Sequence, residues 1–273
     1  MFFSMSKFRL VLCDNDGTLL NDDRELTERS REALLKLHEK GYMVGLASGR
    51  TVSDLMEMPE KWNFDFKFDV LIGVNGAEFY DGITDTVHKY NYLKPEMTKR
   101  IIEAVSPFGY TMQFMRDEHY YFNKMNDFIR ASMSRNATHK IRMVDDISDF
   151  WKDDIPKMLI RLPEAEMPAF EKYFEEHPIK GIIGFKTQPF VYEFMAEGTD
   201  KAVAMKKFCD LHDISLDEVI SFGDTTNDNG MLKHSYGVCL LNGSDDTKAV
   251  SKQITEYDNN HDGFARYVEK YLL

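Results

Sequence analysis

The sequence predicts an α/β protein in which a Rossmann-like, doubly wound parallel sheet is interrupted by an inserted α+β domain. Three observations lead to this class. Short, wholly apolar runs alternate with helical stretches near the N-terminus, hairpins mix with helices in the middle, and the alternation returns towards the C-terminus. The predicted core therefore comprises residues 1–82 and 189–273, and the inserted domain comprises residues 83–188.

The N-terminal part supplies the first half of the predicted core. The apolar run at 8–13 is typical of a strand buried on both faces. Thr27 is a favourable N-cap for the helix that follows, and Gly41 is a favourable stop. Two more buried strands are predicted at 42–48 and 68–76, with a helical stretch between them. Strands and helices that alternate at this spacing favour a parallel sheet covered by helices.

The middle of the chain is typical of an α+β domain. Asp81-Gly82 marks the turn of a hairpin, and a helix is predicted at 95–105. The other elements predicted here are the strands YTMQFM, HYYFNK, KMLIRL, IIGFK and FVYEFM and a helix from about Pro163. The core pattern then returns with a helix from about Asp200, a strand at 218–224, a helix at 227–234, the strand YGVCLL and a helix at 264–271.

The composition argues against several kinds of partner. The 273-residue chain carries a formal net charge of -12, which disfavours nucleic acid and anionic lipid. Its three cysteines form no CxxC pair, and their odd number argues against a secreted disulfide framework. The sequence shows no signal-peptide pattern and no apolar run long enough to cross a membrane. We therefore expect a cytoplasmic protein that binds neither nucleic acid nor membrane, of an oligomeric state that the sequence does not predict.

An acidic stretch, DNDGTLLNDDRE at 14–25, follows the first predicted strand. Its spacing is close to that of a calcium-binding EF-hand loop, but that loop needs a glycine at the sixth position and a helix before it, whereas Gly17 stands at the fourth. A second interpretation places Asp14 and Asp16 at the carboxyl end of a buried parallel strand, the edge where ligands bind in open α/β sheets. A solvated acidic turn is the third interpretation.

A second acidic cluster follows a later predicted strand. The segment GDTTNDNGML contains Asp224, Asn227 and Asp228 immediately before a predicted helix. Helix capping favours Asp and Asn at such a place, but it accounts for one side chain and not for three. The cluster therefore indicates more than the start of a helix.

Two further signals are weak when taken singly. Ser48 and Gly49 of ASGR offer a hydroxyl and backbone N–H groups near a helix N-terminus, where an anion can bind, although an ordinary turn explains them too. Lys201 stands near the start of a helix, where its charge opposes the helix dipole, although a solvated lysine is the simpler explanation. Together with the acidic segments, these groups supply a nucleophile, an acid/base carboxylate, ligands for Mg²⁺ and contacts for phosphate oxygens, as phosphoryl transfer requires.

In this order, DNDGTL, ASGR, Lys201 and GDTTND resemble the four motifs of the haloacid dehalogenase superfamily of phosphatases. Asp16 and Ser48 are too close in sequence for a cap domain between them, whereas the stretch from Ser48 to Lys201 accommodates an α+β cap. VNGAEFYDG at 74–82 and NNHDGFARYV at 259–268 resemble the Cof-type, class IIB members. The resemblance implies the haloacid dehalogenase fold with a C2B-type cap, and Mg²⁺-dependent hydrolysis of sugar phosphates or other small phosphate esters.

The resemblance also implies roles for individual residues. Asp14 would be the nucleophile that becomes phosphorylated, and Asp16 would protonate the leaving alcohol and then activate water. The residues that would bind the phosphoryl group are Ser48, Gly49, Lys201 and Asn227, and Asn75 is expected near them. The implied metal ligands are Asp14, the backbone carbonyl of Asp16, Asp224 and, in support, Asp228.

Three functions stay open at this point. The first is a phosphatase, the second is a phosphomutase that returns the phosphoryl group to a sugar, and the third is a non-catalytic phosphate-binding regulator, which has no use for a nucleophile. One residue departs from the family pattern, because Asn15 replaces the usual apolar residue between the two aspartates. If its amide points into the core it needs hydrogen-bond partners. The sequence predicts neither the substrate nor the cap residues that select it.

Overall fold

The computed structural model describes residues 8–116, 119–125, 130 and 140–273, and the chain forms two compact units. One unit comprises Met1–Tyr90 and Asp200–Leu273, and the other comprises Asn91–Thr199. Both boundaries lie further along the chain than the predicted ones at 82 and 188. The reason is strand pairing, because the strand at Thr86–Lys89 pairs within the first unit and the strand at Val191–Ala196 pairs within the second.

The first unit is built on an eight-stranded sheet in the order β14-β13-β12-β1-β2-β3-β4-β5. The strands are β1 (Leu10–Cys13), β2 (Met43–Ala47), β3 (Val70–Gly73), β4 (Glu78–Asp81), β5 (Thr86–Lys89), β12 (Val219–Gly223), β13 (Tyr236–Cys239) and β14 (Gln253–Ile254). Neighbouring strands are parallel from β14 to β3, and β3, β4 and β5 pair antiparallel. The predicted parallel sheet is confirmed, and the predicted hairpin forms its antiparallel edge.

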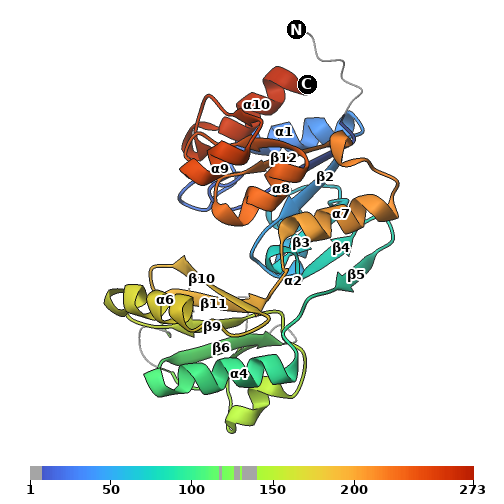
Figure 1. Ribbon diagram of the computed structural model, residues 1–273. Coiled ribbons are helices and arrows are strands. Elements are labelled where there is room, and N and C mark those ends of the chain that lie inside the picture. Colours follow the sequence, from blue (N-terminus) through green and yellow to red (C-terminus); the bar gives the residue numbers. More distant parts are fainter. Residues whose placement is uncertain (1–7, 117–118, 126–129, 131–139) are drawn as a thin grey trace. The chain divides into compact units, whose positions relative to one another are not determined.

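Helices cover both faces of this sheet (Figure 1). They are α1 (Glu28–Glu39), α2 (Val52–Met56), α3 (Met58–Lys61), α7 (Lys201–Leu211), α8 (Asn229–His234), α9 (Asp245–Val250) and α10 (Gly263–Tyr271). Alternate residues of β1 serve the two faces: Val11 and Cys13 join the core that contains residues of α1 and α10, while Leu10 and Leu12 join the core that contains residues of α7. The fold is therefore a doubly wound sheet, and Thr27 caps α1 as predicted, through a 3.2 Å bond from the backbone N–H of Ser30.

The second unit contains a six-stranded sheet in the order β10-β11-β9-β6-β7-β8. Its elements are α4 (Pro95–Val105), β6 (Thr111–Arg116), β7 (His119–Phe122), β8 (Lys140–Met143), β9 (Met158–Arg161), α6 (Met167–Glu176), β10 (Ile182–Gln188) and β11 (Val191–Ala196). Neighbouring strands are antiparallel except for β7 and β8. Apolar side chains of α4 and α6 share a core with Phe114, Ile160 and Phe194 of the sheet. The unit is the α+β insertion that the sequence predicts, although β8 is an addition.

Nowhere in the described part of the chain is a helix both long and apolar enough to traverse a lipid bilayer.

Asn15 lies at the end of β1 and is fully buried. Among the described residues, neither its Oδ1 nor its Nδ2 has a hydrogen-bond partner. Its backbone carbonyl, in contrast, accepts hydrogen bonds from the N–H groups of Leu19 and Leu20. A buried polar group without a partner lowers stability by about 1–3 kcal/mol. With no partner from the described residues, the Asn15 amide is expected to be less favourable in the core than an apolar side chain.

We predict that Asn15→Leu raises the melting temperature, because it replaces an unpaired buried amide with an apolar side chain of similar shape. A gain of about 1 kcal/mol corresponds to ~2–4 °C in a protein of this size. Differential scanning calorimetry measures the change. Asn259→Leu is the matched control, since that buried amide donates to the Leu20 carbonyl and its loss should lower the melting temperature. A lower melting temperature for Asn15→Leu would mean that a buried water pairs the amide.

Candidate active site

The predicted motifs meet at one edge of the main sheet. Asp14 follows β1, Ser48 follows β2 and Asp224 follows β12, and these three strands are neighbours in the sheet. Because the strands are parallel, their carboxyl ends share an edge, which is where doubly wound sheets bind ligands. Lys201 is the first residue of α7, and its side chain reaches the same place. Residues far apart in sequence are thus brought together as predicted.

A buried ion-pair cluster occupies the centre of this edge. Lys201 is fully buried, and its Nζ donates to Asp14 Oδ1 and to Asp228 Oδ1, each at 2.6 Å. Carboxylate oxygens of Asp14, Asp224 and Asp228 all lie within 4.8 Å of one another. The cluster contains three buried carboxylates and a single ammonium group, which binds two of them, so it carries an excess of negative charge when the carboxylates are ionised.

Burial and the excess of negative charge shift the pKa values of the groups in the cluster. Burial raises the pKa of Asp14 well above its usual value, and the Lys201 ammonium offsets this only in part. Burial and the Asp228 carboxylate raise the pKa of Asp224 to about 6. Burial alone would lower the pKa of Lys201, but Asp14 and Asp228 outweigh that effect and raise it. A site with surplus carboxylate charge and only oxygen donors fits a hard divalent cation such as Mg²⁺ or Ca²⁺.

The loop around Gly17 fits closely against Asp224. Thr18 Oγ1 donates to Asp224 Oδ1 at 2.7 Å. Gly17 has a φ of +85°, and a Cβ at that position would lie 2.5 Å from Asp224 Oδ2. Both the left-handed backbone and the lack of space therefore require glycine here.

Both carboxylate oxygens of Asp228 accept hydrogen bonds within the site. Its Oδ1 accepts from Lys201, and its Oδ2 accepts from the backbone N–H groups of Asp224 and Thr225, at 3.0 and 3.1 Å. Both carboxylate oxygens are therefore already in use.

Asp16 is not part of the three-carboxylate cluster. Its two oxygens accept from Arg50, with 3.0 Å from Nε to Oδ2 and 2.7 Å from Nη2 to Oδ1. The Asp16 side chain is 46% exposed, so its carboxylate is accessible at the rim of the buried cluster. Arg50 is a residue of this edge that was not predicted from the sequence, although its place beside Ser48 and Gly49 is the signal that could have identified it.

Ser48 and Asn227 approach the site from different strands. Ser48 is buried, and its Oγ accepts from the backbone N–H of Arg50 at 3.2 Å. The predicted helix after Ser48 is broken into α2 and α3 and so has little dipole to offer an anion. Asn227 Nδ2 donates to Asn75 Oδ1 at 3.1 Å, and that oxygen would lie 3.3 Å from a Cβ at Gly49. Gly49, Asn75 and Asn227 are therefore neighbours.

The calcium-loop interpretation of residues 14–25 is wrong. The strand β1 precedes Asp14, where an EF-hand requires a helix. Later in the segment, the Asp22 carboxylate accepts from the side-chain amides of Asn259 and Asn260. Its oxygens thus bind the C-terminal part of the chain and not a cation shared with Asp14.

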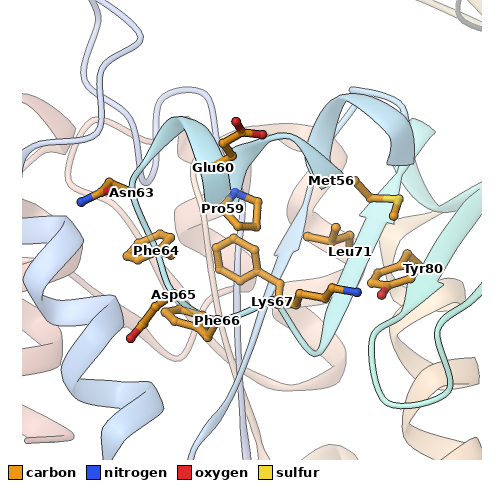
Figure 2. Close-up of a pocket in the computed structure, with 11 residues that line it drawn as sticks. Met56, Pro59, Glu60, Asn63, Phe64, Asp65, Phe66, Lys67, Leu71 and Tyr80 are labelled. Atoms are coloured by element: carbon orange, nitrogen blue, oxygen red, sulfur yellow. The ribbon is translucent and has the colours of Figure 1, made fainter.

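An aromatic pocket with a volume of about 460 Å³ lies elsewhere in the first unit. Figure 2 shows its wall of Phe64, Phe66, Pro59 and Leu71, with Tyr80 at one end. Most of these residues come from α3 and from the segment that leads into β3, at the amino end of that strand. The pocket is therefore separate from the edge that holds the carboxylate cluster.

Comparisons with known proteins agree with this geometry. Residues 11–268 match the family model described as haloacid dehalogenase-like hydrolase. The 5-amino-6-(5-phospho-D-ribitylamino)uracil phosphatase YitU of Bacillus subtilis is 25% identical over an alignment that covers 96% of this chain and 97% of YitU.

Solved structures show that the likeness extends to the whole fold. A haloacid dehalogenase-like hydrolase from Bacteroides thetaiotaomicron gives a TM-score of 0.85 at 24% identity, covering 97% of this chain and 99% of that one. The subclass IIB sugar phosphatase BT4131 gives a TM-score of 0.80 at 21% identity, covering 96% of this chain and 98% of that one. The family match and the inserted antiparallel sheet lead to one assignment. The chain belongs to the haloacid dehalogenase-like hydrolases, and it has the fold of a solved subclass IIB member.

Proposed function

We propose that this protein is a Mg²⁺-dependent phosphatase that hydrolyses small phosphate monoesters through an aspartyl-phosphate on Asp14. The observation that carries the proposal is the position of Asp14, which follows a central strand and lies 2.6 Å from the buried Lys201 ammonium beside two further carboxylates. A protein that only binds phosphate has no use for a buried nucleophile. The geometry therefore favours catalysis over regulation.

The proposed reaction has two steps. A carboxylate oxygen of Asp14 attacks phosphorus, the bond to the ester oxygen breaks, and Asp16 donates a proton to the leaving alcohol. Asp16 then removes a proton from water, which attacks the phosphorus, releases inorganic phosphate and restores the Asp14 carboxylate. Lys201 holds Asp14 in place, and Ser48 and Asn227 bind the phosphoryl oxygens together with the Gly49 N–H.

The carboxylate charge that Lys201 does not balance would attract the cofactor to this cluster. Mg²⁺ bound by Asp14, the Asp16 carbonyl and Asp224, with Asp228 in support, would neutralise charge on the transferring phosphoryl group.

The substrate we propose is a phosphorylated sugar or sugar alcohol chain. The support is the relative YitU, whose named substrate carries its phosphate on a ribityl chain. All three cysteines of this protein are free and buried, which supports the cytoplasmic location that we propose. A panel of phosphorylated metabolites, assayed for released phosphate, tests the substrate class. Isomerised monophosphate formed in the presence of a sugar bisphosphate would instead identify a phosphomutase.

Asp14→Asn should abolish hydrolysis of p-nitrophenyl phosphate while the protein stays folded, because an amide is not a nucleophile. Steady-state release of p-nitrophenol measures activity, and circular dichroism checks the fold. Asp23→Asn makes the same change of charge at an exposed position of the same segment and should keep full activity. Substantial turnover by a folded Asp14→Asn protein would exclude the covalent mechanism.

Asp16→Ala should slow the release of poor leaving groups far more than that of good ones. General acid catalysis contributes about 10²–10⁴-fold, and p-nitrophenolate needs little of it. The measurement compares kcat/KM for p-nitrophenyl phosphate and for an alkyl phosphate in the variant and the wild type. Equal losses on the two substrates would contradict the role of Asp16 as an acid.

Asp224→Ala should weaken Mg²⁺ and Ca²⁺ binding together, since both ions would use the same carboxylates. Isothermal titration calorimetry measures both affinities without turnover. In the wild type, Mg²⁺ affinity should fall as the pH drops through about 6, because a protonated Asp224 is a poor ligand and its pKa is about 6. Ca²⁺ should also inhibit competitively against Mg²⁺. An unchanged Ca²⁺ affinity in the variant would show that the ion binds elsewhere.

A further inference from the structure

The turn that follows β3 has an unusual backbone. Val74, Asn75 and Gly76 adopt φ values of 48°, 51° and 97°, so three consecutive residues lie in the left-handed region. Asn tolerates this region, but a β-branched residue such as valine is a genuine outlier there. Such strain costs free energy and persists only where the surrounding structure imposes it, which is common at functional sites.

Two loops of the active site impose this conformation. The N–H of Val74 donates to the Arg50 carbonyl at 2.7 Å, and the N–H of Asn75 donates to the Ser48 carbonyl at 3.0 Å. A Cβ at Gly76 would lie 2.1 Å from the carbonyl oxygen of Asp200, the residue before Lys201. The turn is therefore held against the Ser48–Arg50 loop on one side and against the start of α7 on the other.

The Asn75 side chain extends these contacts to the acidic loop. It is 6% exposed, and its Oδ1 accepts from Asn227 Nδ2 at 3.1 Å. Asn227 Oδ1 in turn accepts from Thr225 Oγ1 at 2.6 Å. The backbone of Asn75 is thus bonded to the loop that carries Ser48, while its amide is bonded to the loop that carries Asp224.

We propose that Asn75 is a positioning residue that fixes Asn227 and the spacing between the phosphate-binding loop and the acidic loop. The proposal rests on the proposed function, in which these two loops contact the same phosphoryl group. Their relative placement is critical because a displacement of about 1 Å can cost ~10²-fold in rate. The left-handed conformation is retained because it directs the Asn75 amide at Asn227 while its N–H binds Ser48.

Two substitutions distinguish the effect of the left-handed backbone at Asn75 from the effect of its side-chain amide. Asn75→Gly keeps the left-handed backbone without strain and removes the amide, whereas Asn75→Ala removes the amide and adds strain. Asn75→Ala should therefore melt at a lower temperature than Asn75→Gly. We expect kcat/KM for p-nitrophenyl phosphate to fall by about tenfold or more in both variants. Wild-type kcat/KM in Asn75→Gly would overturn the proposal, since it would mean that only the turn matters.

Asn63→Gly is the matched control. Asn63 has a φ of 52° and follows α3, away from the carboxylate cluster. The same substitution in the same backbone conformation should leave kcat/KM unchanged. A loss as large as that of Asn75→Gly would show that the effect is not specific to the bridge between the loops, which would also overturn the proposal.

A double-mutant cycle with Asn227→Ala tests whether Asn75 acts through Asn227. If it does, the double variant should lose no more activity than Asn227→Ala alone, whereas additive losses would contradict the coupling. The cycle is repeated on the Kd for inorganic phosphate in the presence of Mg²⁺, by calorimetry. This second readout needs no turnover, so a wild type that hydrolyses nothing would refute the proposed function while the phosphate-binding cycle still decides the role of Asn75.

Discussion

The site depends on the two ion pairs that the buried Lys201 ammonium forms with aspartate side chains. The ammonium group binds Asp14 at the end of β1 and Asp228 in the loop after β12, and so ties α7 to two neighbouring strands of the sheet. Removing one partner of a buried ion pair costs about 3–5 kcal/mol, because the other charge is left without compensation. The lysine and the two carboxylates must therefore be kept together.

The charge balance of this cluster explains how an acidic protein can handle an anionic substrate. The net charge of -12 repels phosphate esters at long range, and the cluster adds more carboxylate than ammonium. The positive charge of Lys201 alone does not overcome this repulsion, since its ammonium group already binds two carboxylates. The proposed divalent cation would supply the missing positive charge at the point where the phosphoryl group binds. Negative surplus in the protein and positive charge in the ion are thus complementary.

Close backbone contacts hold the loops around the cluster in place. Gly17 leaves room for Asp224 to approach, and Thr18 donates to the same carboxylate. The strained turn at Val74 and Asn75 connects the loop after β2 with the loop after β12. These contacts are made at the carboxyl edge of one sheet, and the fold stability that the helices and sheet provide offsets the strain at this edge.

The sequence by itself determined the class of fold and the polar segments that lie together at the carboxyl edge of the sheet. Apolar runs of strand length, the Thr27 cap and the DNDGT, ASGR and GDTTND segments are local signals, and the structure places their residues where parallel strands end together. The predicted domain boundaries differ from those of the two compact units. The sequences of β5 and β11 predict strands, but they do not show which unit contains the strands that pair with them.

Only the tertiary structure decided which side chains contact one another. The bidentate pairing of Asp16 with Arg50, the use of both Asp228 oxygens and the lack of described partners for the Asn15 amide depend on distances between residues that are far apart along the chain or turned to different faces. The bond from Asn227 to Asn75 is of the same kind. Local sequence patterns report backbone preference and burial, whereas hydrogen bonds and ion pairs require the three-dimensional approach of groups that packing alone sets.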